Sequence, residues 1–544
     1  MFDKSLPEPG QVAGLSDAAL IDAMAGWASV CAAADARRLA VIAEFTTRRL
    51  AGDEFADWAV DGFEAAAIEV GAALNVSSGM AASQMHLAMA LCTRLPGVFA
   101  RYAAGEVDTR TATTIKRRTD LVQDPGALAA LDSALVQNLT SYGPLSLRKL
   151  ETAIDLWVTA VDPDAVCRTR RSARDREIGF GDPGDGEGTT TIWGRLLATD
   201  AKLLDIRLDG MAKAVCGDDP RTVAQRRADA LGVLAAGGDR LACACGGSGC
   251  PVAGGDVRAA SVMVYVLTDP ETLTAQADPL CHGEDRPGPG EPPRVPRPGR
   301  GDKIRIGRPK AEPPQLSQRG NEPEHEARRT PAYASKSAQL RPALIVGGSI
   351  VPAPLLAELI ANGAKVRQLK SPAVEAHPRY RPTAAQDIWV RMRDMTCRAP
   401  GCDRPATAAD IDHTVPWPAG PTHPSNTKCY CRLHHLAKTF WPGFGDRQRP
   451  DGVVEWTMPT GHSYTTSPFS RVLFPAWNTT TAALADPPAL LPPHPTRGLK
   501  MPKRKRTRAK EREYRINAER ALNAERARSS ERAFSSGDGT APPF

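Results

Sequence analysis

Residues 397–438 read CRAPGCDRPATAADIDHTVPWPAGPTHPSNTKCYCRLHHLAK, and their cysteines and histidines determine how this part of the C-terminal half folds. Cys397 and Cys402 enclose a tight turn. Cys431 and His434 follow with the three-residue spacing that places side chains on one face of a helix. Two ligands from a turn and two from a helix predict a tetrahedral zinc site.

Zinc would stabilise a unit that is too small for a sufficient core of its own. About 60 residues bury little apolar surface, whereas structural zinc contributes roughly 10–16 kcal/mol of apparent binding energy. Cys429, two residues before Cys431, leaves the choice of one ligand open. We favour Cys431, because a Cys and a His three residues apart converge on a helix.

A second set of residues in this stretch is not needed for zinc: Asp412, His413, Asn426 and His435. Hydrolysis of a phosphodiester needs an activated water and a cation beside the phosphoryl oxygens. His413 could take the proton of that water, since an imidazole with a pKa of about 6.5 is largely neutral at the pH of the cell. Asp412 and His435 could bind the divalent cation.

The neighbours of these residues support two separate sites. His434 and His435 are adjacent in sequence but about 100° apart around a helix, so they would serve different sites. Asn426 could fix the orientation of His413 through a hydrogen bond. Lys438 lies one turn after His434 and could contact a phosphate.

The pattern resembles the HNH endonuclease motif in its zinc-bound ββα-metal form, with His413, Asn426 and His435 as the three name residues. An Ala-rich helical N-terminal part precedes this stretch, and DGVVEWTMPTGHSYTTSP (residues 451–468) follows it. Together they resemble the actinobacterial family that carries domain of unknown function 222, including the mycobacterial 13E12 repeat proteins. The resemblance extends to about residue 470.

The resemblance implies an endonuclease that hydrolyses DNA with Mg²⁺ or another divalent cation at Asp412 and His435, beside a structural zinc. Two other functions fit the same residues. One is a DNA-binding or mobile-element-associated protein that uses the fold with little or no hydrolysis, and the other is an RNA nuclease. Whether such an enzyme nicks one strand or cuts both depends on whether the chain forms a homodimer.

The composition predicts several folded parts of mixed α+β class. The chain has 544 residues, of which 42% are hydrophobic and 24% charged, as is typical of globular proteins. Ser16 is a plausible N-cap, and the helix after it would place Leu20, Met24 and Trp27 on a buried face with Cys31. The first part of the chain is therefore predicted to be mainly helical, with some β-structure.

The boundaries follow from changes in composition. Nine prolines within residues 287–314 predict a flexible linker. The predicted parts are a mainly helical domain (14–282), a disordered linker (283–333), a strand–helix segment that completes the helical domain (334–376), the HNH-like module (377–470) and a basic tail, disordered or helical (480–544).

The tail concentrates the positive charge of the chain. Residues 497–532 contain fourteen Lys or Arg and five Glu, whereas the whole chain carries a net charge of only +7. Such an arm could bind DNA without sequence preference. The clearest candidates are Lys503, Arg504, Lys505 and Arg506, and a solvated tail without a ligand is the alternative.

A second group of cysteines, Cys243, Cys245 and Cys250, lies in the Gly-rich sequence CACGGSGC. These residues could bind a second zinc ion with Cys281 or His282 as the fourth ligand. Reduced loop thiols without metal are an equally good interpretation, because the Cys-x-Cys spacing is unusual for zinc.

The compartment follows from the start of the chain. MFDKSLPEPG lacks a basic segment followed by an apolar one, so we expect a cytoplasmic protein that is not inserted in a membrane. In that compartment thiols stay reduced, which favours metal binding over disulfides.

Overall fold

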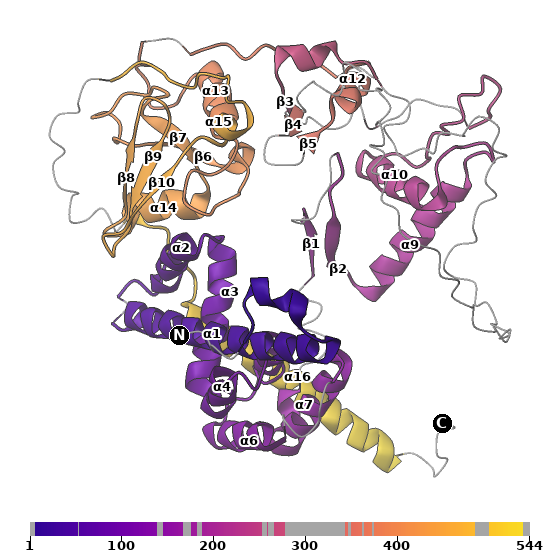
Figure 1. Cartoon of the computed structure of the whole chain (residues 1–544), viewed down its shortest axis with the longest axis vertical. Coiled ribbons are helices and arrows are strands. Elements are labelled where there is room, and N and C mark those ends of the chain that lie inside the picture. The colour runs from indigo at the N-terminus through magenta and orange to yellow at the C-terminus, as the bar shows by residue number, and fades with distance from the viewer. Residues whose placement is uncertain are drawn as a thin grey trace. The chain divides into compact units, whose positions relative to one another are not determined.

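The structure is a computed structural model, and it combines helices with short antiparallel sheets, as the predicted α+β class requires (Figure 1). It describes residues 6–52, 54–138, 145–166, 176–181, 188–252, 258, 266–277, 343–345, 350–361, 364–372, 375–484 and 500–536. The chain divides into two compact units, which are Met1–Glu177 with Leu369–Phe544, and Ile178–Gln368.

The N-terminal helical body (residues 6–166) is built from short helices around one long helix. Its elements are η1 (Pro9–Gly14), α1 (Asp17–Leu50), α2 (Gly62–Leu74), α3 (Ser78–Met89), η2 (Ala90–Arg94), α4 (Pro96–Ala103), α5 (Thr109–Arg118), α6 (Pro125–Asn138), α7 (Leu147–Val161) and η3 (Pro163–Ala165). The side chains of Ser16, Asp61, Ser77 and Asp108 cap four of these helices by accepting a backbone N–H of the first turn. These caps satisfy donors that a helix start leaves unpaired.

Helix α1 begins where the sequence predicts, but the predicted core stripe in its first half is wrong. Met24 is 62% exposed and Cys31 is exposed. The buried residues lie further along, at Ala32, Ala36, Leu39, Ile42, Ala43 and Thr46. At 34 residues α1 is much longer than α3 and α4, on which it packs, so only part of it is covered.

Helix α2 contributes to two different cores. Phe63, Ala66 and Val70 pack with the other N-terminal helices. Ala65 and Ile68, on another side of α2, pack with residues of the C-terminal half, including Tyr430, Cys431 and Trp456. A helix that is apolar on all sides is typically buried on all sides, and the sequence GFEAAAIEVGAAL fits this position.

The cysteine–histidine module (residues 375–484) contains the candidate metal ligands of residues 397–438. Its elements are α13 (Ala384–Asp394), η6 (Ala406–Ala408), β6 (Asp410–His413), β7 (Thr427–Tyr430), α14 (Arg432–Phe440), β8 (Gly445–Gln448), β9 (Val454–Thr457), β10 (Ser463–Thr466) and α15 (Phe469–Leu473). Strands β6 and β7 are antiparallel, with Asp412 opposite Lys428 and His413 opposite Thr427. Strands β8, β9 and β10 form a separate antiparallel sheet with β9 in the centre.

Helix α13 is attached to the β6–β7 hairpin by a fully buried ion pair. Arg393 and Asp394 are 0% exposed and contact each other. Arg393 donates to the carbonyls of Pro424 and Thr427, and Asp394 accepts the backbone N–H of Cys429. A buried charge is tolerated only when it is paired and fully hydrogen-bonded, so this network fixes α13 in a single position against the hairpin.

The basic tail is folded in its described part. Helix α16 (Arg508–Ser536, yellow in Figure 1) packs on the N-terminal helical body and buries Ile516 in the same core. Arg508 pairs with Asp61, Arg512 with Asp120 and Arg520 with Asp162. Just before the helix, Lys503 contacts Asp57, while Arg504 donates to the carbonyls of Trp58 and Ala59. Many of the basic residues predicted to form a free arm are thus paired with acidic side chains or backbone carbonyls of the same chain.

The unit Ile178–Gln368 is smaller and less regular. Its elements, together with the strand that leads into it, are β1 (Glu177–Phe180), β2 (Ile192–Arg195), α9 (Ala198–Lys213), α10 (Val223–Ala235), β3 (Val266–Leu267), η4 (Pro270–Thr274), β4 (Ala343–Ile345), β5 (Ile350–Val351) and α12 (Ala353–Ala361). Strand β4 pairs with both β3 and β5, so the segment after the predicted linker joins a strand that precedes it. The linker itself, residues 283–333, lies outside the described residues.

The division of the chain differs from the one expected from the sequence. Residues 178–368 form a unit of their own, and the module shares a unit with the N-terminal helices. The physical reason is the second core on α2, which links helices and module across more than 300 residues of sequence. Sequence composition marks flexible segments but does not show which folded parts share a core.

Among the described residues, one helix, α1, is long and apolar enough to span a membrane. Residues Gly62–Leu74 and Ser78–Arg94 pass the same test when they are treated as one segment. The two helices are, however, bent by 106° relative to each other. This is weak evidence for a membrane span, since core helices of soluble proteins also pass.

We predict that α16 is an integral part of the helical body. Replacing Ile516 with Asp would place an unpaired carboxylate in the core and should lower the free energy of unfolding by about 2 kcal/mol or more. Ala521→Asp, at an exposed position of the same helix, is the matched control and should change it little. Thermal unfolding followed by circular dichroism measures both. Equal melting curves for the two variants would show that α16 is not anchored.

Candidate metal centre and active site

The four predicted zinc ligands lie together. One ligand atom each from Cys397, Cys402, Cys431 and His434 falls within 4.8 Å of all the others. The Sγ of Cys431 is 3.1 Å from His434 Nδ1 and 4.0 Å from the Sγ of Cys402. Tetrahedral zinc with Zn–S of about 2.3 Å and Zn–N of about 2.0 Å requires ligand separations of about 3.5–3.8 Å. This group could therefore hold a metal such as zinc.

The structure also separates Cys431 from Cys429. Cys431 is the N-cap of α14 and belongs to the ligand group. Cys429 is 0% exposed and packs with Trp389 and Ala406 in a different apolar cluster. The geometry therefore favours the choice of Cys431 that was made from its spacing to His434.

A residue of the N-terminal helical body completes the surroundings of this group. The Oγ of Ser78, the first residue of α3, is 3.2 Å from His434 Nε2, while His434 Nδ1 faces the sulfurs. Metal-bound histidines generally use their second nitrogen for such an outer hydrogen bond, which fixes the ring. Gly401, at a φ of +67°, lies so close to the Val76 carbonyl that a Cβ would be 2.5 Å from its oxygen. The turn between Cys397 and Cys402 is thus shaped to fit the helical body.

His435 faces away from the sulfurs, as predicted from its position on the helix. Its Nδ1 lies 2.8 Å from Asp410 Oδ2, and its Nε2 lies 3.4 Å from Asp412 Oδ1. A carboxylate only accepts, so the ring lies between two acceptors, Asp410 at Nδ1 and Asp412 at Nε2. Metal-binding histidines typically have a carboxylate at their second nitrogen, as Asp410 is placed here.

Two buried lysines surround Asp412. Lys438 Nζ is 2.7 Å and Lys428 Nζ 3.3 Å from Asp412 Oδ2, and Lys428 also pairs with buried Asp446 at 2.8 Å. Burial by itself would raise the pKa of Asp412, but the two ammonium groups outweigh it and lower the pKa from 3.8 to about 2. Asp412 is therefore ionised at neutral pH. Lys438, predicted to contact a phosphate, is only 7% exposed and bonded within this network.

The hydrogen bonds of His413 define which of its nitrogens can act as a base. Its Nε2 lies 2.8 Å from the Oγ of Thr422, and that hydroxyl donates its one proton to the carbonyl of Tyr380 at 3.1 Å. Thr422 must then accept from His413, so Nε2 carries the proton and Nδ1 has the lone pair. Burial lowers the pKa of His413 from 6.5 to about 4, so the ring is neutral at pH 7.

Asn426 has a different role from the one predicted. Its side chain exchanges hydrogen bonds with the backbone of Val415 and donates to the carbonyl of Pro421. It thereby fixes the loop between β6 and β7, and the residue that orients His413 is Thr422. The sequence gives no sign of this, because a threonine in a loop is a common residue.

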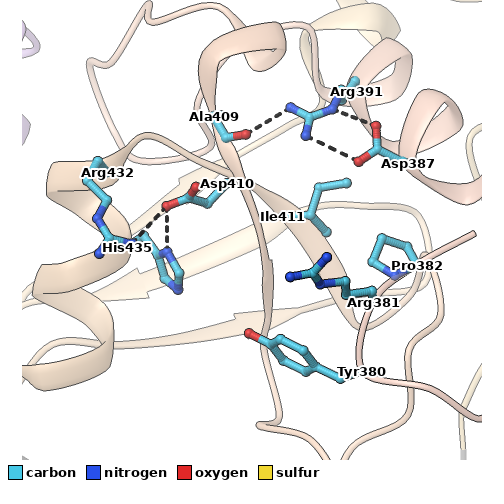
Figure 2. Close-up of a pocket in the computed structure, with 10 residues that line it drawn as sticks. All are labelled: Tyr380, Arg381, Pro382, Asp387, Arg391, Ala409, Asp410, Ile411, Arg432 and His435. Atoms are coloured by element: carbon cyan, nitrogen blue, oxygen red, sulfur yellow. Dashed lines mark hydrogen bonds and ion pairs between the residues drawn. The ribbon is translucent and has the colours of Figure 1, made fainter. Parts of the chain in front are cut away.

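A cavity of about 360 Å³ opens beside His435. Figure 2 shows Tyr380, Arg381 and Pro382 on one side of it, and Asp410 and His435 on another. Tyr380 also stacks on His413, with ring centres 5.3 Å apart and planes 17° apart. The same tyrosine therefore adjoins both His413 and the cavity at His435. Arg381 contributes positive charge to its walls, while Arg432 on the wall is paired with Asp410.

The remaining predicted residues lie elsewhere. Lys505 and Arg506 are exposed, and Arg506 contacts Glu511 and the ring of Tyr514. Cys243, Cys245 and Cys250 form a second group that could hold a metal, together with Cys216, which was not predicted. The alternatives proposed for this fourth position, Cys281 and His282, lie outside the described residues.

Comparison with known proteins places this architecture in a family. Residues 28–288 match a domain of unknown function, DUF222. The uncharacterized protein Rv2100 of Mycobacterium tuberculosis H37Rv is 51% identical over 523 residues, which cover 96% of this chain and 90% of the relative. The chain belongs to the DUF222 family. The uncharacterized protein Rv3776 of the same strain is 50% identical over 525 residues, covering 96% of this chain and 93% of the relative.

Another mycobacterial member of the DUF222 family is shorter. The uncharacterized protein in the est 3′ region of M. tuberculosis is 46% identical over 386 residues, which are 71% of this chain and 99% of that protein. No solved structure matches the chain significantly. The relatives thus extend the resemblance to nearly the whole chain, including the tail, without naming an activity.

We predict that Cys431 is a zinc ligand and Cys429 is not. Cys431→Ser should release one equivalent of zinc per chain, because the ligand group loses one of its four donors. Cys429→Ser changes the same side chain two residues away and should keep the metal, although a buried hydroxyl lowers stability somewhat. Elemental analysis of the purified full chains measures the difference. Loss of zinc from Cys429→Ser alone would reverse the assignment.

Proposed function

We propose that this DUF222 protein is a metal-dependent endonuclease of the HNH type that hydrolyses phosphodiester bonds in DNA. The observation that carries the proposal is a neutral imidazole at His413, held through Nε2, directly after Asp412 in β6, whose carboxylate contacts His435 of α14. Phosphodiester hydrolysis requires both a base for water and a place for a cation.

The donor set fits a divalent cation. Asp412 is ionised, Nε2 of His435 lies 3.4 Å from its Oδ1, and Asp410 lies 2.8 Å from the other nitrogen of that ring. With the proton on Nδ1, the Nε2 lone pair and Asp412 would both be available to one cation. A Mg²⁺ or similar ion bound there would neutralise charge on the phosphoryl oxygens and stabilise the leaving oxygen. One carboxylate and one imidazole leave the other ligand positions to water and phosphate, which suits Mg²⁺.

The residues of the chain would share the remaining work. His413 would take a proton from the attacking water at Nδ1, while Thr422 holds the ring through Nε2. Arg381 and Arg432 at the cavity would bind phosphate oxygens beside the scissile bond. Lys428 and Lys438 would keep Asp412 deprotonated and correctly placed.

DNA is the proposed substrate on the grounds of charge and family resemblance. The cavity has arginines on its walls, and Lys505, Arg506 and Arg515 remain exposed near or on α16. These groups would attract any polyanion. RNA cleavage, and DNA binding without hydrolysis, are therefore the outcomes against which the proposal is tested.

We predict that His413→Ala lowers the rate of plasmid nicking by roughly 10²–10⁴-fold, because the water loses its base. The control His462→Ala removes an exposed histidine that contacts Thr460 and should cleave normally. Both variants and the wild type are assayed with Mg²⁺, Mn²⁺ or Ni²⁺ on supercoiled DNA and on an RNA of equal length. Cleavage of RNA alone, binding without cleavage, or full activity in His413→Ala would each contradict the proposal.

We further predict that Thr422 acts by positioning His413. Thr422→Val should lower kcat roughly 10–100-fold with little change in KM, because the ring loses the acceptor that fixes its tautomer. Thr422→Ser keeps the hydroxyl and should restore most of kcat. If Val and Ser behave alike in single-turnover cleavage, the hydroxyl has no part in orienting the base.

A further inference from the structure

The unit Ile178–Gln368 contains a cluster of four cysteines far from the candidate active site in sequence. From this cluster we infer a second structural zinc site, a tetrathiolate formed by Cys216, Cys243, Cys245 and Cys250. The four Sγ atoms lie within 4.8 Å of one another, and Cys216 and Cys243 are 3.2 Å apart, a non-bonded separation between free thiols. A tetrahedral tetrathiolate of zinc requires sulfur–sulfur distances of about 3.8 Å, so small shifts would accommodate the ion.

Two separate segments contribute the sulfurs. Cys216 follows the end of α9, whereas the other three lie in the loop after α10. Gly246, with a φ of +69°, allows this loop to turn, and Cys250 N–H donates to the Gly247 carbonyl at 3.1 Å. The Cys-x-Cys spacing is unusual for zinc, but the glycines let this turn direct three thiols toward one point.

A buried ion pair holds the two segments together independently of the thiols. Arg221 Nη2 donates to Asp219 Oδ2 at 2.7 Å and to the Ala242 carbonyl at 2.7 Å. Asp219 Oδ2 accepts the backbone N–H of Ala244 at 3.0 Å. Asp219 and Arg221 are 5% and 7% exposed. The loop that carries Cys243 and Cys245 is thus fixed next to the loop that carries Cys216 by hydrogen bonds that do not involve sulfur.

The cluster lies beside a small apolar core. Only five buried hydrophobic residues belong to that core among the described residues: Met211, Val215, Ala230, Val233 and Leu241. Cys243 is partly buried against it. A core of this size stabilises the packed pair α9 and α10 weakly, whereas structural zinc contributes roughly 10–16 kcal/mol of apparent binding energy. Zinc beside this core would therefore be a main source of its stability.

The four thiolates also determine which metal ions this site would bind. Soft sulfur ligands in tetrahedral arrangement select zinc or iron over the hard cations Mg²⁺ and Ca²⁺. Closure by four protein ligands leaves no open position for water, so this would be a structural and not a catalytic site. The inference does not depend on the proposed nuclease activity.

The experiment is elemental analysis of the full chain purified without chelator, with free thiols counted in parallel. The wild type should hold two zinc ions per chain, Cys216→Ser and Cys431→Ser one each, and the double variant none. Cys31→Ser changes an exposed cysteine outside both groups and should keep two. Cys216→His retains a zinc-type ligand and should recover the second ion, which separates lost coordination from general misfolding.

Three results would overturn the inference. The first is one zinc in the wild type that Cys216→Ser retains. The second is iron in place of zinc at the same stoichiometry. The third is a wild type with two thiols fewer than its cysteine count after unfolding in chelator without reductant, because a disulfide would then occupy the cluster.

Discussion

The ligand atoms of Cys397, Cys402, Cys431 and His434 meet at one point, and the geometry of the candidate active site depends on that convergence. They come from the turn after α13 and from the start of α14, so they join the two ends of the hairpin β6–β7. His435 is the next residue after a ligand, and its direction is therefore set by the position of His434. Asp412 and His413 lie on the strand that the same group holds against α14.

Residues from other parts of the chain form hydrogen bonds and ion pairs with polar groups around this ligand group. Ser78 contacts His434 from the helical body, and Glu69 accepts the backbone N–H of Thr460 from β9–β10. Asp446, on β8, pairs with Lys428 and accepts the hydroxyl of Tyr430. Each of these contacts satisfies a buried or half-buried polar group that would otherwise be costly. The helical body is thus part of the scaffold of the site and not merely attached to it.

Features that depend on residues close together in the sequence could be predicted from the spacing of those residues. The grouping of the four candidate metal ligands, the choice of Cys431, the opposite directions of His434 and His435, and the cap at Ser16 all follow from residue type and helical period. Thr422, Asp446 and Cys216 could not be predicted, because their roles arise from residues that meet only in the folded chain. The stripe at Met24 failed for a related reason: periodicity shows that a helix has an apolar face, but not whether a partner is long enough to cover it.

The position of α16 has a consequence for the order in which the protein can be made. Ile516 completes a core whose other members lie between Ala32 and Val166. A ribosome synthesises from the N-terminus, so part of the apolar surface of the early helices stays open to solvent until the segment around Ile516, about 350 residues after Val166, has been made. The cationic residues on either side of Ile516 pair with acidic residues of the helical body. Because these acidic residues are made first, charge attraction would guide α16 to its position on the body.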